Sequence, residues 1–511
     1  MANLTAPDQE LKTSIYRKFA GINQTDARTA IADEEFHWLE NAIPIGQGNV
    51  KLVPAQGAPV ATLTGTTATM FGYTLKLAGA EIPVLICFKT DGSAQQVRLD
   101  TFATTSLGGA GTFTVAARTA IWQDTPILIV DPTKGYFSWD GTTLTTIDAT
   151  KKATDIAVFE GRAWLVTAAR TITFTSPNTF NDFTGGNGSG SVTISDSSFT
   201  GNIVRLLSAL EQLWIVGNSA VNAITNVSTT GTPLTTTFSL TNIVSNVGSP
   251  YPSSVNAFFR TFIFLNHYGV YAIVGATPQK LSDKLDGLFS SLNLTGTDNP
   301  SATFSLYDIF HWAVLVTLVD PFARGTFPVL LMFSQGKWFI ARQGDNLKWI
   351  AGVPSTTGDP LVWGTDGTNI YQLFAGSSTT PVPYLIKTKL FDFGEWTQQK
   401  HWDYIGLEFT SQNTVISPTI NIENERQVVG SPAIVSPANI LQFIGAGNVP
   451  LNFVGTGTIV FVASGLQLLM NAQAIGIYGH YFGFTMSGTE APWTWSSYAF
   501  GTIEAGRWQH L

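Results

Sequence analysis

Short apolar runs separated by polar turns recur along most of this chain. In residues 154–176, TDIAVFEGRAWLVTAARTITFTS, three such runs follow one another, and Glu160-Gly161 separates the first from the second. Runs this short, rich in β-branched and aromatic residues, predict antiparallel strands rather than a helix. The runs around Val158 and Trp164 are apolar on both faces, so we expect neighbouring units to cover both faces of this small sheet.

The same pattern returns at intervals of roughly 35 to 50 residues, which is the spacing of blades in a β-propeller. Comparable runs open near Phe71, Ile121, Leu207, Phe258, Leu306 and Trp349. Asp140-Gly141 and Asp366-Gly367 supply the positive φ angles that tight hairpins need. We therefore predict an all-β chain that contains a β-propeller of six blades. A series of unrelated hairpins, or two successive β-sandwiches, would produce the same rhythm.

Changes in this pattern divide the chain into three parts. Residues 1–60 mix apolar anchors with acidic and turn residues, which is too little for a domain, and they predict an extended N-terminal arm docked on a surface. Residues 61–380 are predicted to form the propeller. Residues 381–511 are predicted to form a C-terminal β-sandwich-like domain.

The predicted propeller has a closure point and two polar inserts. Ring closure requires its two ends to meet, which should bring Val60 or Thr62 near Leu373. The glycine-rich insert at 177–200 is expected to be a mobile surface loop, or else a long arm ordered only by a neighbour. A threonine-rich insert at 227–237 is a second excursion of this kind.

The composition favours a protein that hides much of its surface in an assembly. Charged residues make up 12% of the chain, about half the usual share, while hydrophobic residues reach 44%. Few groups are therefore available to solvate the exterior. The net charge of −8 argues against a general nucleic-acid-binding surface. The single cysteine, Cys87 in IPVLICF, excludes an intrachain disulfide and is predicted to be an inert core thiol.

One long segment near the C-terminus carries no charge at all. Between Arg426 and Glu490 there is no Asp, Glu, Lys or Arg. Inside it FIGAG at 443–447, FVGTG at 453–457 and FVASG at 461–465 form a small internal repeat. Residues 459–486 are apolar enough to suggest a transmembrane helix, but polar residues and glycines interrupt them, so strands and turns are favoured over membrane insertion. We expect this segment to pack between subunits. The chain opens without a basic and apolar signal peptide, so we expect no secretory route.

The chain offers few residue combinations that carry chemistry. No pair of histidines has the spacing of metal ligands among His37, His267, His311, His401, His480 and His510. One cysteine is too few for a multi-thiolate zinc site. Nucleophile-elbow, phosphate-loop and dinucleotide-binding motifs do not occur. We therefore predict no catalytic residue, no cofactor-binding residue and no metal-binding residue.

Acidic and aromatic residues are the types that a glycosidase-like or sugar-binding site would need. Asp33-Glu34-Glu35 is expected to be a solvated turn, whereas Asp308, Asp320 and Asp403 suit either strand-end turns or a binding role. Tryptophans occur in most of the predicted blades and are expected to fill the core between them, namely Trp122, Trp139, Trp164, Trp214, Trp312, Trp338 and Trp363.

Two segments carry a resemblance to a known family. The first is YRKFAGIN at 16–23, followed by Asp26, DEE at 33–35, LENAIP at 39–44, Gly46, Gly48 and KLVP at 51–54. The second is KTKLFDFG at 387–394, with Lys400 after it. This order resembles phage tail proteins built on β-propellers, among them the tail nozzle proteins of short-tailed bacteriophages. The resemblance covers residues 17–57 and continues only as blade rhythm to about residue 376. An edge strand followed by a loop is the alternative interpretation of the first segment.

The resemblance implies a structural virion protein rather than an enzyme. In such a tail, copies of the chain form a homohexameric ring that extends the channel for DNA ejection. The implied partners are further copies of the chain, the portal or adaptor ring, and tail fibres or spikes, with double-stranded DNA passing through without specific binding. Its place is the phage tail, after synthesis in the host cytoplasm. Two other functions stay open: a receptor- or glycan-binding propeller of the virion, and, with nothing specific to support it, a propeller hydrolase.

Overall fold

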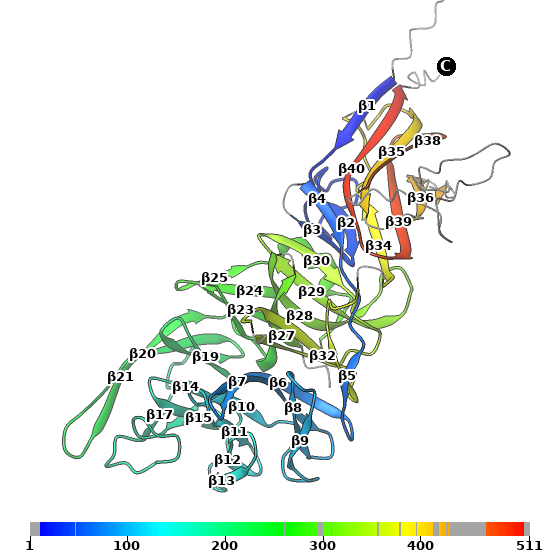
Figure 1. Ribbon diagram of the computed structural model, residues 1–511. Coiled ribbons are helices and arrows are strands. Elements are labelled where there is room, and N and C mark those ends of the chain that lie inside the picture. The colour runs from blue at the N-terminus through cyan, green and yellow to red at the C-terminus, as the bar shows by residue number, and fades with distance from the viewer. Residues whose placement is uncertain are drawn as a thin grey trace, which may run out of the picture. The chain divides into compact units, whose positions relative to one another are not determined.

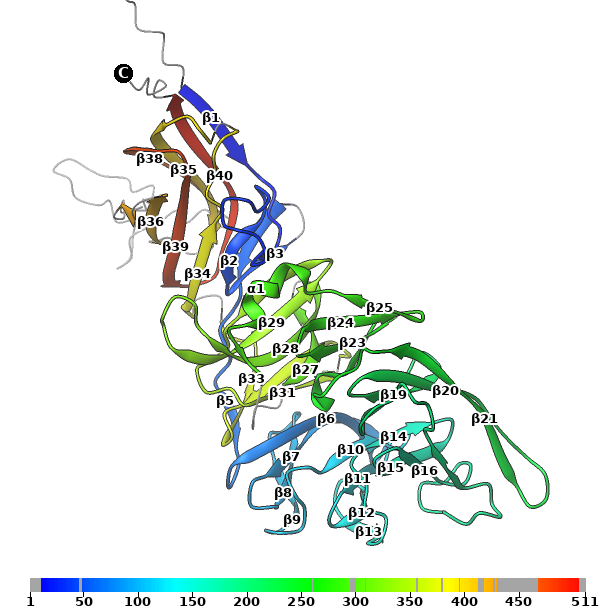
Figure 2. The ribbon, with the colours of Figure 1, turned by 180° about the vertical axis from the view of Figure 1, so that it is seen from behind.

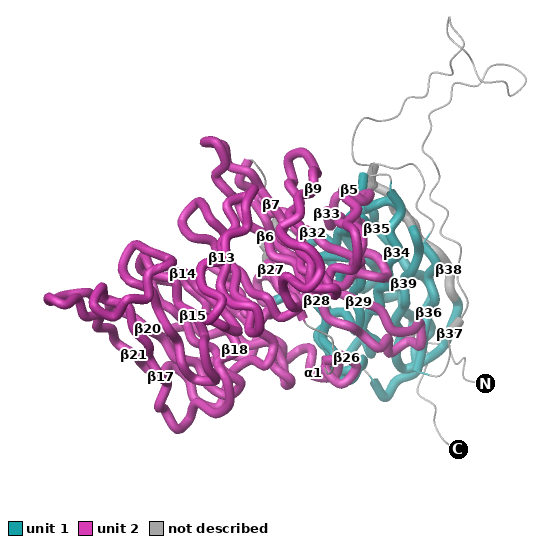
Figure 3. Tube along the Cα trace, turned by 90° about the horizontal axis from the view of Figure 1, so that it is seen from below, with its two compact units in different colours: residues 1–55, 337–341, 376–511 teal, residues 56–336, 342–375 magenta. Residues whose placement is uncertain are grey.

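The computed structural model describes residues 11–45, 48–259, 261–294, 300–307, 309–354, 357–377, 380–394, 396–411, 418–425, 428–429 and 467–504. The regular secondary structure of the described chain is almost entirely β-strand, as predicted (Figure 1). Its helical elements are α1 (Asp286–Phe289) and the 3-10 turns η2 (Pro252–Ser254) and η3 (Asp283–Leu285). The chain divides into two compact units, which Figure 3 colours separately. Unit 1 comprises residues 1–55, 337–341 and 376–511, and unit 2 comprises residues 56–336 and 342–375.

Unit 2 contains six four-stranded antiparallel sheets within the described residues, seen from opposite sides in Figures 1 and 2. The first three sheets are β6 (Thr67–Leu77), β7 (Ala80–Lys89), β8 (Ala94–Arg98) and β9 (Thr104–Gly108); β10 (Arg118–Ile121), β11 (Ile127–Asp131), β12 (Gly135–Trp139) and β13 (Leu144–Asp148); and β14 (Ile156–Phe159), β15 (Arg162–Ala168), β16 (Thr171–Phe174) and β17 (Gly190–Thr193). The other three are β18 (Ile203–Ala209), β19 (Gln212–Gly217), β20 (Ala220–Thr230) and β21 (Thr235–Ser245); β22 (Asn256–Phe258), β23 (Thr261–Asn266), β24 (Gly269–Val274) and β25 (Thr277–Lys280); and β31 (Trp349–Pro354), β32 (Pro360–Thr365), β33 (Asn369–Gln372) and β5 (Pro59–Thr62).

A further group of strands lies between the fifth and sixth of these sheets in the sequence. It consists of β26 (Leu292–Asn293), β27 (Ser301–Tyr307), β28 (Ile309–Val319) and β29 (Thr326–Ser334). β28 pairs with each of the other three in antiparallel fashion. The sequence predicted six blades, whereas unit 2 contains six complete four-stranded sheets and this additional group of strands.

The sheet β14–β17 shows how the sequence pattern becomes structure. Its first hairpin turns at Glu160 and Gly161, whose φ angles are 47° and 61°. Trp164 on β15 is fully buried and packs with residues of β18–β20, including Leu213. The alternate side chains of β15 face the other way and pack with residues of β11 and β12, including Leu128. Neighbouring sheets thus cover both faces, which confirms the expectation from the sequence.

The first strands of successive sheets contact one another within unit 2. In chain order these strands are β6, β10, β14, β18, β22, β27 and β31. Tyr73 on β6 and Thr119 on β10 share a hydrogen bond of 2.8 Å between their hydroxyls. The following strands contact each other pairwise, and β31 in turn contacts β6. Four-stranded antiparallel sheets in this arrangement are compatible with the blades of a β-propeller.

A strand from the beginning of the chain completes the last sheet of unit 2. β5 pairs with β33 in antiparallel register, with Thr62 opposite Asn369 and Ala61 opposite Ile370. Just before β5, the Gly57 amide donates to the Gln372 carbonyl at 2.8 Å. The sequence predicted this meeting near Leu373, the residue after β33.

Unit 1 contains two groups of strands. One consists of β1 (Leu11–Tyr16), β3 (Ala42–Ile45), β4 (Asn49–Leu52), β35 (Lys400–Ser411), β38 (Gln467–Gly479) and β40 (Trp493–Glu504). The other consists of β2 (Phe36–Glu40), β30 (Lys337–Ala341), β34 (Val382–Thr388), β36 (Thr419–Asn424), β37 (Val428–Val429) and β39 (Phe482–Glu490). Strands of residues 381–511 thus occur in both groups, and the sandwich-like arrangement expected for these residues stays a prediction.

Residues expected to form a separate N-terminal arm belong to unit 1 instead. β1 pairs with β40 over its whole length, from Leu11 opposite Ile503 to Tyr16 opposite Tyr498. β2 pairs with β34 on one side and β30 on the other. The division at residue 60 therefore differs from the structure, because strands near the N-terminus supply part of both sheets of the C-terminal unit.

Aromatic rings fill the core of unit 1. Phe19 is 4% exposed, and its ring centroid lies 5.8 Å from that of Phe36 and 5.1 Å from that of Trp495. Trp495 and Tyr498 continue the cluster on β40, with ring centroids 5.2 Å apart. Residues from both ends of the chain therefore share one core.

The internal repeat at 443–465 lies outside the described residues, as does most of the charge-free segment. Its later part, from residue 467, forms β38 and β39. Within the described residues, no helix has the length and apolar character needed to cross a membrane.

Replacing Phe19 by alanine should destabilise unit 1 strongly. The substitution removes a buried ring and leaves a cavity, so we expect a loss of about 3–5 kcal/mol in the free energy of unfolding. Ile15→Ala is the matched control, because Ile15 is 55% exposed and should change stability by less than about 0.5 kcal/mol. Denaturant unfolding followed by tryptophan fluorescence measures both. Equal stability of the two variants would contradict a core shared by residues 11–45 and β40.

Candidate functional site

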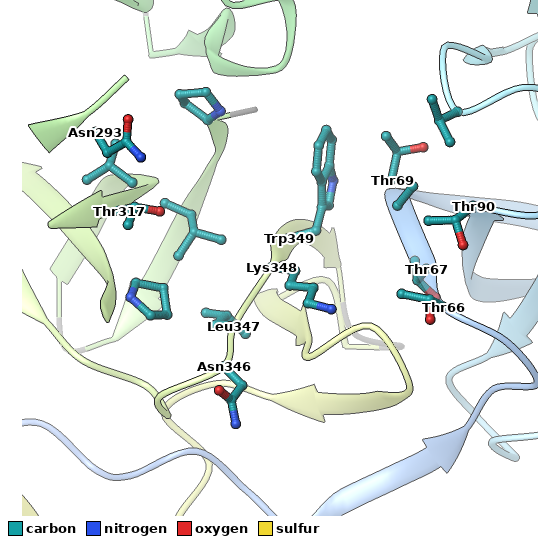
Figure 4. A pocket seen from close by; sticks show the side chains of 16 residues that line it. Thr66, Thr67, Thr69, Thr90, Asn293, Thr317, Asn346, Leu347, Lys348 and Trp349 are labelled. Carbon is teal, nitrogen blue, oxygen red and sulfur yellow. The ribbon is translucent and has the colours of Figure 1, made fainter. Parts of the chain in front are cut away.

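A cavity of about 640 Å³ lies in unit 2. It is lined from β6, from β28 and β29, and from the segment that leads into β31. Figure 4 shows Asn293 and Thr317 on one side, Thr66, Thr67, Thr69 and Thr90 on the other, and Trp349 between them. Hydroxyl and amide groups therefore approach this cavity from several different strands.

Two threonines of β6 leave unused hydrogen-bonding groups at this cavity. Thr67 is 2% exposed and Thr69 is 4% exposed, and neither hydroxyl has a hydrogen-bond partner in the described structure. The register between β6 and β7 shifts between these two residues, so the strand is irregular where it borders the cavity. A buried hydroxyl without a partner costs about 1–3 kcal/mol, and a polar ligand or water would remove that cost.

Trp349 forms an apolar wall of the same cavity. Its indole Nε1 donates to the Met70 carbonyl at 2.6 Å, which fixes the plane of the ring. Lys348 is the one charged residue among the described residues that line the cavity. Such a lining suits the binding of a neutral polar molecule, and it supplies neither of the paired carboxylates that glycoside hydrolysis requires.

A second cavity, of about 490 Å³, lies among the first strands of the sheets. Its lining comes from β6, β18, β22, β27 and β31, together with η2 and the segments beside it. Arg205 of β18 is the charged residue in this lining. Its Nη1 donates to Asp155 Oδ1 at 2.7 Å, while the Leu206 amide donates to Asp155 Oδ2 at 2.5 Å. The Asp155 side chain, 1% exposed, is therefore occupied on both oxygens.

A second arginine adjoins this cavity through two of its lining residues. Arg118 Nη1 donates to Ser253 Oγ at 3.1 Å, and the guanidinium lies 5.7 Å from the centre of the Phe71 ring. Burial, followed by the charge of Arg205, lowers the pKa of Arg118 to about 10. Arg118 still carries its positive charge at neutral pH, in surroundings that already contain one guanidinium.

A third arginine organises the glycine-rich segment that follows Pro177. Arg162 is 1% exposed. Its guanidinium donates to the carbonyl of Thr175 at 2.5 Å, to the carbonyl of Gly188 at 2.9 Å, and to the hydroxyls of Thr229 and Thr236. All four acceptors are neutral. Burial lowers the pKa of this guanidinium, because no anionic acceptor in the described structure offsets its desolvation.

The expectation that residues 177–200 form a mobile loop, or an arm ordered only by a neighbour, was therefore wrong for residues 188–193. The segment is neither a free loop nor an arm that waits for a neighbour, because Gly190–Thr193 form β17 and Gly188 is held by Arg162. The threonine-rich insert at 227–237 forms the far end of the long β20–β21 hairpin, whose two strands have 11 residues each. Arg162 therefore joins the glycine-rich segment to the β20–β21 hairpin. Local composition does not reveal such a contact between distant segments.

Acidic residues singled out from the sequence serve turns and ion pairs. Asp320 accepts hydrogen bonds from the Phe322 amide and from Arg324 at the turn between β28 and β29. Asp33 pairs with Lys389 at 2.7 Å. The expectation of a solvated turn was wrong for Glu35, which is 6% exposed and accepts from the Asn23 side chain at 2.8 Å. Asp403 lies on β35, and Asp308 is outside the described residues.

The tryptophans and the cysteine occupy the core, as predicted. Every tryptophan expected to fill the core is less than 9% exposed, namely Trp122, Trp139, Trp164, Trp214, Trp312, Trp338 and Trp363. Cys87 is fully buried on β7, and burial raises the pKa of its thiol to about 12. Within the described residues, no three histidine, cysteine or acidic side chains gather closely enough to hold a metal ion.

His37 on β2 is the histidine whose surroundings change its protonation most clearly. Burial, with the positive charges of Arg28 and Lys387, lowers the pKa of His37 to about 4. Its Nδ1 is buried without a hydrogen-bond partner in the described structure. The folded chain therefore keeps this imidazole neutral well below pH 6.

Arg162→Met should detach the glycine-rich segment from the β20–β21 hairpin. The substitution leaves buried carbonyls without donors, so we expect a loss of about 2–4 kcal/mol in stability. Amide hydrogen exchange at residues 185–190 should rise with it. Arg170→Met is the control from the same sheet, since Arg170 makes one exposed bond of 3.3 Å to the Gly201 carbonyl. Unchanged exchange in the Arg162 variant would contradict its role.

The stability of the protein should fall as the pH drops from about 6.5 to about 4. In this window the unfolded chain binds a proton at His37 while the folded chain does not, so protonation favours unfolding. His37→Gln should make the decline shallower by about 1–3 kcal/mol. His401→Gln, whose ring lies 4.6 Å from that of the exposed Tyr478, is the control. Parallel pH profiles for wild type and His37→Gln would show that this histidine is not the cause.

Comparison with protein families and with curated proteins finds no match to this chain.

Proposed function

We propose that this protein is a structural component of a phage tail, whose copies form a ring that extends the channel for DNA ejection. The proposal starts from the resemblance of residues 17–57 and 387–394 to tail nozzle proteins of short-tailed bacteriophages. It is supported by one structural observation, which is that these two segments, more than three hundred residues apart, bind each other inside unit 1.

Three contacts join the two segments. Arg28 Nε donates to the Thr388 carbonyl at 2.7 Å, and the Leu390 amide donates to the Arg28 carbonyl at 3.1 Å. Lys389 pairs with Asp33 at 2.7 Å. Asp33, Thr388 and Lys389 belong to the quoted motifs, while Arg28 lies within the first segment between them. The two segments therefore form one structural element, which fits segments of a shared architecture better than two chance matches.

We further propose that unit 2 is a β-propeller with seven blades, one more than expected from the sequence. The six four-stranded sheets would be six blades, and β26–β29 would be the seventh. Support comes from the succession of first strands, in which β27 contacts both β22 and β31. The sheet of β31–β33 and β5 would close the ring, since it combines strands from both ends of the unit.

The charge of the chain suits a channel that DNA passes without binding. Six copies at −8 each would together carry 6 × −8 = −48, and DNA is itself a dense polyanion. A surface with few cationic side chains releases few counterions from DNA, so association should be weak even at low salt. The hexamer, the portal or adaptor ring as neighbour, tail fibres or spikes as further partners, and the place in the virion all rest on the resemblance.

Native mass spectrometry of the purified protein tests the ring. We expect a closed cyclic oligomer, with a hexamer as the specific expectation, and no measurable affinity for a DNA duplex at low salt. A stable monomer in virion-like buffer would count against the ring. Tight, salt-sensitive duplex binding would instead overturn the non-binding channel and leave the ring untouched.

The cavity beside Trp349 favours a second candidate, a receptor- or glycan-binding propeller. Its two unpartnered threonine hydroxyls, Thr67 and Thr69, beside an indole ring suit a polyhydroxylated ligand. This function does not require a ring, so a monomer that binds a saccharide would favour it over the first. A propeller hydrolase is the third candidate, and no contact described above supports it.

A further inference from the structure

We propose that the cavity among the first strands of unit 2 is a binding site for a small oxyanion, held by Arg118 and Arg205. The natural ligand class is a compact phosphate or carboxylate group, free or on a small molecule. This inference does not depend on ring formation, because all of its residues lie in unit 2 of a single chain.

The charges at this place do not balance. Arg118 and Arg205 bring two positive charges, and Asp155 brings one negative charge. Both oxygens of Asp155 are already engaged, one by Arg205 and the other by the Leu206 amide. Arg118 has no carboxylate within bonding distance in the described structure. One positive charge is therefore left uncompensated beside a cavity of about 490 Å³.

Hydrogen-bond donors at this place also remain unused. The Nε of Arg205 is buried and has no partner in the described structure. Among the described residues, the Arg118 guanidinium makes one hydrogen bond, from Nη1 to Ser253 Oγ. Ser253 lines the cavity, and a hydroxyl that accepts from an arginine can still donate its own proton to a ligand. Arg205 and Ser253 line the cavity, and Arg118 adjoins it through Ser253. Both guanidinium groups therefore keep donors beyond the one that each already uses.

An oxyanion would satisfy these donors and the charge together. Guanidinium groups bind phosphate and carboxylate oxygens through short, charge-assisted hydrogen bonds. Such bonds are stronger in a cavity than at an exposed surface, because the surroundings screen less. The lining is otherwise neutral and includes the phenol of Tyr73 and the aromatic ring of Phe71, so no acidic side chain in it would repel an anion.

The two arginines come from different sheets, so a ligand bound by both would link separate parts of unit 2. Arg118 belongs to β10 and Arg205 to β18, while Ser253 belongs to η2, just before β22. A ligand that binds all three would join two separate sheets of unit 2 and the η2 turn that precedes a third. Binding should therefore raise the temperature at which this unit unfolds.

Titration with inorganic phosphate at constant ionic strength tests the site. Isothermal calorimetry should show one saturable site per chain, and thermal unfolding should shift upward with phosphate but not with chloride. Citrate in a parallel titration distinguishes carboxylate from phosphate preference. Arg118→Gln should weaken phosphate binding at least tenfold and abolish the thermal shift. Arg205→Lys, which keeps the charge but loses the planar fork, should weaken it less.

Two controls separate binding from folding. Arg98→Gln removes an arginine that pairs with Asp100 at the surface of the same unit, and it should leave phosphate binding unchanged. Without phosphate, Arg118→Gln should be at least as stable as wild type, because it removes repulsion between two guanidinium groups. Absence of saturable binding to wild type would overturn the site. Phosphate binding by Arg118→Gln as tight as that of wild type would also overturn the site. So would an Arg118→Gln variant that is less stable than wild type in chloride but is still stabilised by phosphate.

Discussion

The pairing of β5 with β33 is the constraint on which the organisation of unit 2 depends. Hydrogen bonds between residues 59–62 and 369–371 bring together segments separated by 307 positions, as between Thr62 and Asn369. Without this pairing, β33 would present an unpaired edge, and the last sheet would have three strands where the complete ones have four. The same pairing brings together the place where the chain first enters the unit, at residue 56, and the place where it finally leaves, at residue 375.

The chain enters and finally leaves unit 2 at neighbouring places, and this explains how unit 1 is built. Residues before β5 and residues after β33 are left on either side of unit 2 in the sequence, and both groups carry large aromatic side chains. Phe19 and Trp38 from the first group are buried, as are Trp495 and Phe500 from the second. Each group buries its aromatic rings with the other, so one core serves strands from both ends of the chain. The contacts of Arg28 with Thr388 and of Lys389 with Asp33 belong to this arrangement.

Local signals in the sequence were sufficient for strands, turns and core residues. The φ angles of Glu160 and Gly161, the burial of Trp164 and the burial of Cys87 all follow from short-range pattern and residue type. Pairing between distant strands was harder to predict, because the residues of a strand such as β2 or β5 do not indicate which other strand it pairs with. Only the approach of Val60 or Thr62 to Leu373 was anticipated, since ring closure demands it. The shared core of unit 1 was not.

The arginines show the same limit for candidate sites. Arg118, Arg162 and Arg205 stand in ordinary strand sequences, and nothing beside them suggests burial. Their importance arises from Ser253, Thr236 and Asp155, residues that the fold brings to them from other segments. Thr67 and Thr69 at the larger cavity could not be identified from the sequence either. Whether a threonine hydroxyl lacks a hydrogen-bond partner depends on the strands that surround it in the fold.

A disulfide between positions 62 and 369 tests the closure of unit 2 most directly. Thr62 and Asn369 are directly opposite each other, Thr62 is exposed and Asn369 is half-buried. The native Cys87 is buried, so Thr62→Cys with Asn369→Cys should oxidise selectively. Closure within one chain predicts an intrachain disulfide under mild oxidation and an unfolding temperature above that of the reduced protein. Two free thiols after oxidation, or a disulfide that links two chains, would contradict it.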